Sequence, residues 1–255
     1  MSRKKAEAAN KAKTDFLENM RHDIRTALTG IVGLSELLTT ETDIQTVHVF
    51  SRELVKSSHE LLRFLNEILE SIQVSSGDIQ LLNQPLCLRD ILKSVLNLHQ
   101  PMAIQKQLTL ALEIDNAIPN CLLGDPVRIY RITLELLANA LKFTPTGSVN
   151  IFAALVKQEG QTAIVKILIQ DTGIGIAQDK QSELFIRFNR LTPSYEGIYK
   201  GMGLGLSIVK QFVEDLKGEI YVESHLNEGS QFVFILPLKV SLLEELENTK
   251  FLDTR

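Results

Sequence analysis

The first forty residues constrain the fold more than any other part of the chain. Residues 2–40 contain no proline, and their apolar side chains recur at alternating spacings of three and four. This spacing is typical of a helix that packs along a coiled-coil or bundle seam. The residues of this seam are Leu17, Met20, Ile24, Ala27, Ile31, Leu34 and Leu38. The chain is therefore predicted to begin with a long helix that requires helical neighbours.

A second helix is predicted after a polar break at residues 39–43, and it carries two adjacent apolar seams. One seam contains Val47, Phe50, Leu54, Leu61 and Ile68, and the other contains Leu62, Leu65, Leu69 and Ile72. A helix that is apolar over so broad an arc needs more than one neighbour. The two helices can form an antiparallel hairpin, and a second copy can cover what the hairpin leaves exposed. We therefore predict a homodimer with a four-helix bundle.

The composition changes after the polar residues 75–78, where the second helix is expected to end. Strand-like runs are predicted at about 109–114, 149–156, 163–169 and 232–236, with helices at about 88–105, 125–142 and 204–217. This order predicts an α+β protein. Its domains are a helical hairpin at 1–76, an α/β sandwich with a mixed sheet at 77–240, and a short acidic helix or linker at 241–255.

Charge and composition narrow the functional classes. The net charge is −4 over 255 residues, so the chain has no global basic field for nucleic acid. Cys87 and Cys121 lack metal-ligand spacing, so neither a disulfide framework nor a zinc site is implied, and a reducing cytoplasm is expected. No run of about 18 apolar residues occurs, and the charged N-terminus is unlike a signal peptide. Membrane or sensor segments of a parent protein would lie upstream.

Two glycine clusters suggest a nucleotide site. Asp171 ends a strand-like run and precedes Gly173 and Gly175, while a second cluster, Gly201, Gly203 and Gly205, opens a helix. Glycines allow a backbone to approach a ligand closely, and a helix N-terminus attracts anions. Each cluster taken alone is equally consistent with a tight turn. Neither fits the dinucleotide fingerprint well.

A polar helix face adds a third element. Glu135, Asn139 and Lys142 are spaced i, i+4 and i+7, so they share one face of a predicted helix. An isolated stripe of this kind is usually solvated surface. Its residue types are nevertheless those that hold Mg²⁺ through oxygen and phosphate through an ammonium group.

The order of these motifs closely resembles the nucleotide-binding boxes of bacterial histidine kinases. The motifs are Asn139-Ala-x-Lys-Phe-Thr, Asp171-x-Gly-x-Gly-Ile, Phe185-x-x-Phe-x-Arg190 and Gly201-x-Gly-Leu-Gly-Leu206. Upstream, residues 16–31 around His22 resemble the phospho-acceptor box of the same family. The resemblance runs from about residue 10 to residue 240, with all boxes in family order.

The resemblance implies a role for each nucleotide-site residue. Asp171 would bind the adenine amino group within a loop that includes Gly173 and Gly175, and Ser230 would support that site. Asn139, together with Glu135, would hold Mg²⁺ on ATP. Lys142 and Arg190 would contact phosphate oxygens. Gly201, Gly203 and Gly205, followed by Leu206, would hinge a lid at about residues 189–202.

Helix periodicity places His22 at an outward position beside the first seam. Periodicity alone favours an ordinary surface histidine, whereas the resemblance implies the phospho-acceptor. Asp23 is expected to hydrogen-bond one ring nitrogen and fix the tautomer. Thr26, one turn further on, resembles the residue that orients a water for dephosphorylation of the partner regulator.

The implied reaction transfers the γ-phosphoryl group of ATP to His22, with Mg²⁺ as cofactor, and then to an aspartate of a response-regulator receiver domain. An upstream sensor or signalling domain is also implied. Three departures from the family pattern are Ala27 in place of proline, Arg21 in place of a small residue, and Glu135 in place of asparagine. Glu135 keeps a gyrase- or chaperone-type ATPase clamp open as an alternative, and a non-catalytic nucleotide-binding scaffold is a third possibility.

Overall fold

The structure is a computed structural model that describes residues 2–76, 80–186 and 204–241. Its contacts divide the chain into two compact units. The first contains residues 1–79 with 186–205, and the second contains residues 80–185 with 206–255. Within the described residues, no helix combines the length and the apolar character that crossing a bilayer requires.

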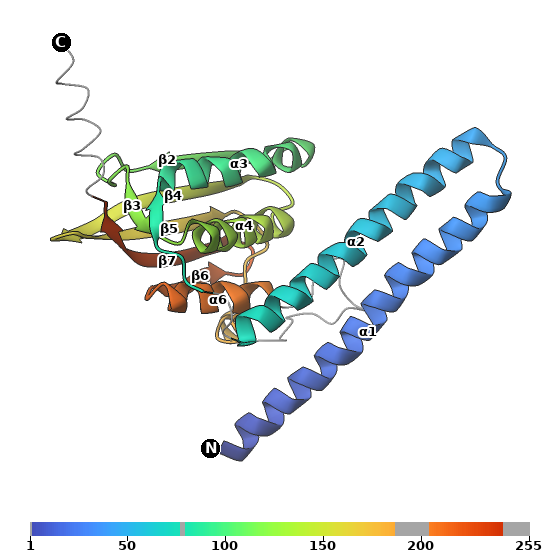
Figure 1. The fold of residues 1–255 in the computed structure, drawn as a ribbon, viewed down its shortest axis with the longest axis horizontal. Coiled ribbons are helices and arrows are strands. Elements are labelled where there is room, and N and C mark those ends of the chain that lie inside the picture. Colours follow the sequence, from blue (N-terminus) through green and yellow to red (C-terminus); the bar gives the residue numbers. More distant parts are fainter. Residues whose placement is uncertain (1, 77–79, 187–203, 242–255) are drawn as a thin grey trace, which may run out of the picture. The chain divides into compact units, whose positions relative to one another are not determined.

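The first unit is a helical hairpin formed by α1 (Ser2–Thr40) and α2 (Ile44–Ser76), as Figure 1 shows. The turn between them is fixed locally. Glu41 accepts hydrogen bonds from the N–H groups of Thr42 and Asp43, and the Asp43 side chain caps α2 by accepting from Thr46 N at 2.9 Å. The predicted hairpin is therefore confirmed, with its turn at the predicted polar break.

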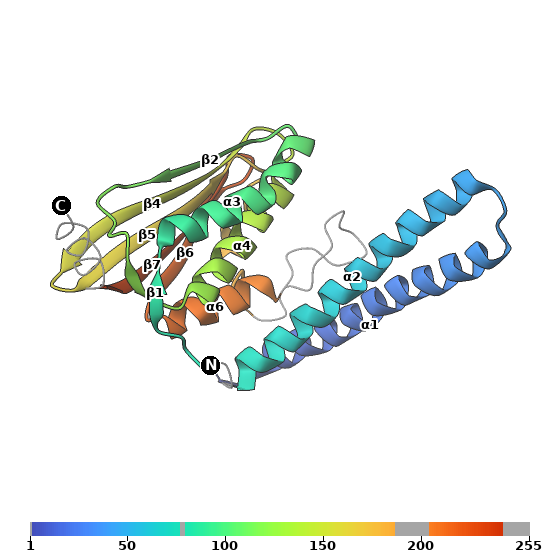
Figure 2. The ribbon, with the colours of Figure 1, turned by 45° about the horizontal axis from the view of Figure 1, so that its top comes forward.

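The second unit is an α/β sandwich whose helices are α3 (Leu88–Gln105), α4 (Pro126–Phe143), α5 (Gln178–Gln181) and α6 (Gly205–Asp215). Its strands are β1 (Gln84–Leu86), β2 (Thr109–Ile114), β3 (Leu122–Gly124), β4 (Ser148–Glu159), β5 (Thr162–Asp171), β6 (Glu219–His225) and β7 (Gly229–Val240). Figure 2 shows α3, α4 and α6 over one face of the sheet.

The sheet order is β1-β3-β7-β5-β4-β2, and β6 also pairs with β7. The β2–β4 pair is parallel and the other pairs are antiparallel, so the predicted mixed sheet is confirmed. β5 alternates strictly between buried and half-buried residues, and its buried side chains pack under the helices. The buried core includes Leu92, Ile132, Leu136, Val165, Ile167 and Phe234.

The sequence did not indicate β1, β3 or β6. The first two have three residues each, which is too short for a strand pattern to register. β6 alternates between exposed and half-buried residues over most of its length, so it lacks the apolar run that marks β5. The predicted tail at 241–255 falls almost entirely outside the described residues.

Candidate functional site

Asp171 is the last residue of β5, and only 5% of its surface is exposed. Its Oδ1 accepts a hydrogen bond from Gly173 N at 2.8 Å. Burial raises the pKa of Asp171, and hydrogen bonds from the backbone N–H groups of Gly173 and Ser230 only partly oppose the shift. A buried carboxyl group that is held by two backbone donors is a fixed acceptor. It suits an amine donor such as the exocyclic amino group of adenine.

The loop after Asp171 requires glycine because other chain segments lie against it. Gly175 has a φ of +66°, and a Cβ atom there would overlap the carbonyl oxygen of His225. A Cβ on Gly173 would overlap the carbonyl oxygen of Phe143, the last residue of α4. Ile174 N also donates to Phe143 O at 3.2 Å. The loop is thus joined to the end of α4, with no room for a side chain at Gly173 or Gly175.

Ser230 belongs to a hydroxyl network beside the same loop. It pairs with Asp171 across the β5–β7 ladder, and its Oγ lies 3.0 Å from Ser224 Oγ. Ser224 Oγ accepts from Ile176 N at 2.8 Å, while Gln181 Nε2 donates to the backbone oxygens of Ser224 and Ile176. Ser224 and Gln181 therefore support the site. Sequence reasoning missed both residues because no local motif marks them.

α4 presents the predicted polar face. Glu135, Asn139 and Lys142 are all half-buried on it, and Asn139 Nδ2 donates to Glu135 Oε1 at 3.4 Å. Lys142 Nζ lies 5.0 Å from the centre of the Phe143 ring. Across the described residues, no cluster of three His, Cys, Asp or Glu side chains could hold a metal ion.

The lysine that directly follows α3 fixes the end of α4. Lys106 Nζ donates to the carbonyl oxygens of Leu141, Lys142 and Thr144, at 2.6, 3.2 and 3.3 Å. These carbonyl groups belong to the end of a helix, where a positive charge is favoured. Lys106 therefore holds the part of α4 to which the glycine loop is joined. It lies far from every motif in the sequence, so no pattern indicated it.

The second glycine cluster is described only in part. Gly205 is the first residue of α6, and both Gly205 and Leu206 are half-buried. Arg190, Gly201 and Gly203 lie outside the described residues.

The start of α4 carries a buried ion pair. Asp125 caps the helix by accepting from Arg128 N at 2.9 Å, and its Oδ2 lies 2.6 Å from Arg128 NH1. The same two side chains bind the segment before β1, because Leu82 N donates to Asp125 and Arg128 donates to Gln80 O. Burial acts to raise the pKa of Asp125, but the hydrogen bonds and the Arg128 charge outweigh it, and the pKa is lowered. This clamp anchors the chain where it enters the second unit.

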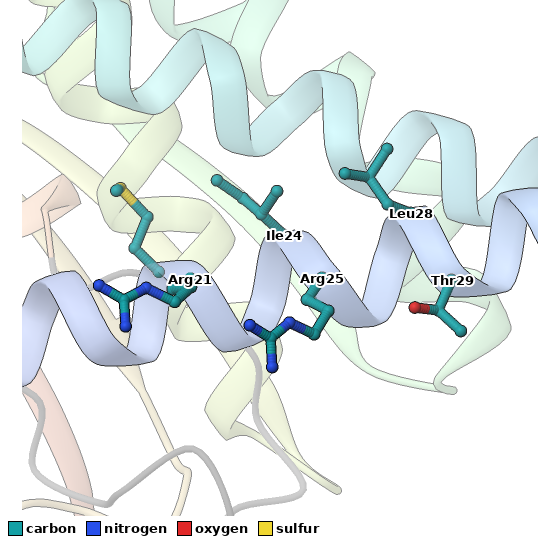
Figure 3. Close-up of a pocket in the computed structure, with 6 residues that line it drawn as sticks. Arg21, Ile24, Arg25, Leu28 and Thr29 are labelled. Carbon is teal, nitrogen blue, oxygen red and sulfur yellow. The ribbon is translucent and has the colours of Figure 1, made fainter.

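On the hairpin, His22 is exposed, as its outward position predicts. The Thr26 hydroxyl donates to the His22 carbonyl oxygen at 2.9 Å. The side chain of Asp23 lies outside the described residues. A shallow hollow runs along α1 nearby, lined by Met20, Arg21, Ile24, Arg25, Leu28 and Thr29. Figure 3 shows the Arg21 and Arg25 guanidinium groups on one side of α1, with Ile24 and Leu28 directed away from them.

The structure thus contains a helical hairpin with an exposed histidine, joined to an α/β domain with a buried carboxyl group that can accept a hydrogen bond. Two families match these parts. Residues 12–77 match the His Kinase A (phospho-acceptor) domain, and residues 124–240 match the histidine kinase-, DNA gyrase B- and HSP90-like ATPase family. The chain therefore belongs to the histidine kinases and comprises their catalytic core. The second unit is accordingly an ATP-binding domain, and the phospho-acceptor match favours the kinase over the clamp and scaffold alternatives.

Individual relatives agree with this assignment. The chain is 37% identical over 238 residues to the sensor protein GacS of Pseudomonas syringae pv. syringae, which covers 93% of this chain and 26% of that protein. It is 34% identical to the autoinducer 2 sensor kinase/phosphatase LuxQ of Vibrio harveyi, covering 94% of this chain and 28% of LuxQ. The chain thus spans about a quarter of the length of these relatives.

A solved structure supports the same fold. The chain is similar to full-length ShkA in complex with AMPPNP, with a TM-score of 0.67 and 28% identity. The match covers 86% of this chain and 45% of ShkA.

Proposed function

We propose that this chain transfers the γ-phosphoryl group of ATP to His22. The observation that carries the proposal is that one chain contains both an exposed histidine within a phospho-acceptor match and a buried acceptor, Asp171, within an ATPase match. The imidazole nitrogen attacks the terminal phosphorus in line, and ADP leaves. His22 is the nucleophile and needs no deep pocket, because the second unit supplies the bound nucleotide.

Asp171 accepts a hydrogen bond from the adenine amino group in this proposal. Gly173 and Gly175 let the backbone approach the base, and Ser230 holds Asp171 in place. Lys142 and Arg190 bind phosphate oxygens, while Gly201, Gly203, Gly205 and Leu206 form the hinges of a nucleotide lid. The buried position of Asp171 and the tight packing around its loop support these assignments.

The residues on α4 fit a Mg²⁺ ion that is held largely by ATP itself. Glu135 and Asn139 offer carboxylate and amide oxygens within one helical turn, which are the ligands that Mg²⁺ prefers. When bound, Mg²⁺ would neutralise charge on the β- and γ-phosphate groups. Glu135 and Asn139 orient the phosphate chain, and Lys142 adds a positive charge on the same face.

Asp23 and Thr26 assist at the acceptor. Asp23 holds one ring nitrogen of His22, so that the other nitrogen is the nucleophile. Thr26 orients a water for dephosphorylation of the partner regulator. Its hydroxyl donates its proton to the helix backbone, which leaves its oxygen to accept a hydrogen bond from that water. One relative, LuxQ, is named as a kinase and phosphatase, which supports a phosphatase role.

A homodimer completes the hairpin. Val55, Leu62, Leu65, Leu69 and Ile72 form an apolar stripe along α2, and each is between 45% and 59% exposed. Their spacing of seven, three, four and three is that of a coiled-coil seam. Leu28 and Val32 continue the exposed apolar surface on α1. A second hairpin would bury both stripes in a four-helix bundle.

The proposed domains are the phospho-acceptor hairpin at 1–76, the ATP-binding domain at 77–240 and a tail at 241–255. The proposed partners are a response-regulator receiver domain, which accepts the phosphoryl group on an aspartate, and an upstream sensor or signalling domain. Relatives that are nearly four times longer than this chain support additional domains in a parent protein. The cytoplasmic location stays a prediction.

Labelled ATP tests the proposal. Incubation of the chain with γ-labelled ATP and Mg²⁺ should give acid-labile label on the protein, and His22→Gln should abolish it. His59→Gln is the matched control, because His59 is also an exposed histidine of the hairpin. Equal labelling of the His22→Gln variant would overturn the proposal. Release of free phosphate without label would instead support the ATPase clamp, the alternative that Glu135 in place of asparagine keeps open.

A further inference from the structure

The two cysteines directly adjoin the ends of two paired strands, β1 and β3, at one edge of the sheet. Cys87 directly follows β1 and Cys121 directly precedes β3, and these strands pair antiparallel with Leu86 opposite Leu122. One further step along this register sets Cys87 opposite Cys121. The two residues are 34 positions apart in sequence, so the fold brings together what the sequence separates.

Pro85 determines the type of this pair. Proline has no N–H group, so the Pro85–Leu123 pair cannot exchange two hydrogen bonds. Because hydrogen-bonded and non-hydrogen-bonded pairs alternate, Leu86–Leu122 is a hydrogen-bonded pair. The Cys87–Cys121 position is then non-hydrogen-bonded, where opposed Cα atoms approach to about 4.5 Å. Disulfides span Cα separations of roughly 4.4–6.8 Å.

The backbone of Cys87 is extended, and Cys121 lies at a bend directly before β3. Cys87 has φ −103° and ψ 108°, which is extended, and α3 begins only at the next residue. Cys121 O accepts a hydrogen bond from Ser241 N at 3.0 Å, which holds it beside the extension of β7. This hydrogen bond lies one step beyond the Leu122–Val240 pair, so the β3–β7 register continues to Cys121.

Burial places the two thiols on the same face. Leu86 and Leu122 are 6% and 0% exposed, so both point into the core. Side chains alternate along a strand, and the neighbouring Cys87 and Cys121 therefore point to the opposite face. Both cysteines are half-buried and both are free thiols in the structure. Each residue is therefore partly accessible to solvent.

We propose that Cys87 and Cys121 form a redox-active thiol pair that closes to an intramolecular disulfide. With peroxide as oxidant, one thiolate attacks an oxygen of H₂O₂ and becomes a sulfenic acid, with hydroxide as leaving group. The second thiol attacks that sulfur, the S–S bond forms, and water leaves. Overall, two thiols are oxidised and one peroxide is reduced to two waters. A dithiol reductant reverses the reaction by exchange.

The disulfide would staple the first turn of α3 to β3, close to the clamp that anchors the entering chain. Cross-linking residues this far apart restricts the unfolded chain strongly. For a domain of this size we expect peroxide to raise the melting temperature Tm of the second unit by roughly 5–15 °C. The inference does not depend on the proposed kinase activity.

Peptide mapping of the full chain tests the proposal. After mild treatment with peroxide in dilute solution, non-reducing digestion should give a linked peptide containing Cys87 and Cys121, about 2 Da lighter than the two reduced peptides. Cys87→Ser and Cys121→Ser should each abolish the linked peptide and the rise in Tm. Dithiothreitol should restore both thiols.

A control variant tests whether disulfide formation requires Cys87 and the second thiol to be directly opposite each other, or only near each other. In Cys121→Ser/Leu123→Cys, the second thiol stays on the same face of β3 but moves two residues along, to a diagonal separation. Its cross-linking with Cys87 should be at least about tenfold slower. Equal rates, oxidation of each cysteine to sulfinic acid without a linked peptide, or linkage only between two chains would each overturn the proposal.

Discussion

The hairpin and the ATP-binding domain differ in how much of their apolar side-chain surface is buried within one chain. Among the described residues of the hairpin, one apolar side chain, Ala27, is buried. The second unit buries apolar side chains from α3, α4, α6 and most of its strands, and Ile132, Val165 and Phe234 are completely covered. The hairpin instead exposes large apolar side chains along both of its helices. The ATP-binding domain therefore has its own hydrophobic core, whereas the hairpin leaves much of its apolar surface exposed in a single chain.

This difference separates the sources of stability in the two units. Burying a Leu or Ile side chain contributes about 1.5–3 kcal/mol, and the stripe on α2 leaves most of this unused in one chain. The stability of the hairpin should therefore depend on protein concentration, whereas that of the ATP-binding domain should not. Substitutions in the hairpin should therefore affect dimerisation, whereas substitutions in the ATP-binding domain should affect the stability of the single chain.

The largest expected effect is loss of the dimer when a charge enters the stripe. Leu65→Asp should weaken association by at least about 100-fold, because the carboxylate would be buried without a partner. Sedimentation velocity measures the change. Val49→Asp is the control, since Val49 is a similarly exposed residue on another side of α2. If both variants stay dimeric, the contrast between the two units is wrong.

The second prediction concerns the ATP-binding domain, which should lose stability when the Asp125–Arg128 ion pair is broken. Arg128→Met removes the partner of buried Asp125, and we expect the unit to lose about 3–5 kcal/mol of unfolding free energy. Urea unfolding measures this loss, and the exposed Arg131→Met serves as control. Asp125→Asn/Arg128→Met should recover part of the loss.

The pH dependence of the clamp has a defined sign. The folded pKa of Asp125 is lowered below 3.8, so its ionised form stabilises the native state. This contribution is complete above the unfolded pKa and is lost as the pH falls through the lowered folded pKa. The advantage of the wild type over the double variant should therefore shrink in acid. A pH-independent difference would show that the pair does not act through charge.

Much of this contrast could be predicted from the sequence. The two seams of the second helix predicted that it needs more than one neighbour, and the structure half-buries Val47, Phe50 and Leu54 while it exposes Leu62 and Leu65. Helical periodicity is local, so a single chain carries this information. The predicted helix at 88–105 has the same bounds as α3 for the same reason.

The supports of the site could not be predicted. Lys106 reaches carbonyl groups 35 to 38 residues away, and Ser224 joins the loop at Ile176 from 48 residues away. Such contacts depend on strand order and on how helices lie on the sheet. The predicted adenine acceptor had a local signal, because the glycines that surround it are adjacent in sequence. The cysteine pair had none, because its register depends on two three-residue strands.

The next effect separates backbone strain from steric overlap. Gly175→Ala introduces a side chain at positive φ and against the His225 carbonyl group, so we expect a loss of about 2–4 kcal/mol and weaker nucleotide binding. Gly160 has a similar φ of +59° with nothing within 4 Å of an added Cβ. Gly160→Ala should therefore cost only about 1 kcal/mol. Equal losses in thermal unfolding would contradict the close packing of the loop.

The smallest expected effect is a gain in stability on replacing Asp171. It tests whether the buried Asp171 carboxyl group lowers the stability of the ATP-binding domain. Burial raises the pKa of Asp171 above 3.8, so its ionised form opposes folding. This penalty is absent below the unfolded pKa and complete above the raised folded pKa. Asp171→Asn should raise the Tm of the nucleotide-free protein by a few degrees at neutral pH and have no effect in strong acid. Its affinity for ATP should fall about 10- to 100-fold, because a charged acceptor is lost.

Calorimetry across pH, with and without nucleotide, measures both the rise in Tm and the loss of ATP affinity. Asp179→Asn is the control, because Asp179 is an exposed carboxyl group in the same unit. A variant that binds ATP like the wild type would remove Asp171 from the adenine site. A variant that is less stable at neutral pH would show that the hydrogen bonds from Gly173 and Ser230 outweigh the cost of burial. In that case the ATP-binding domain would carry its acceptor without any loss of stability, and the hairpin alone would be the incomplete unit.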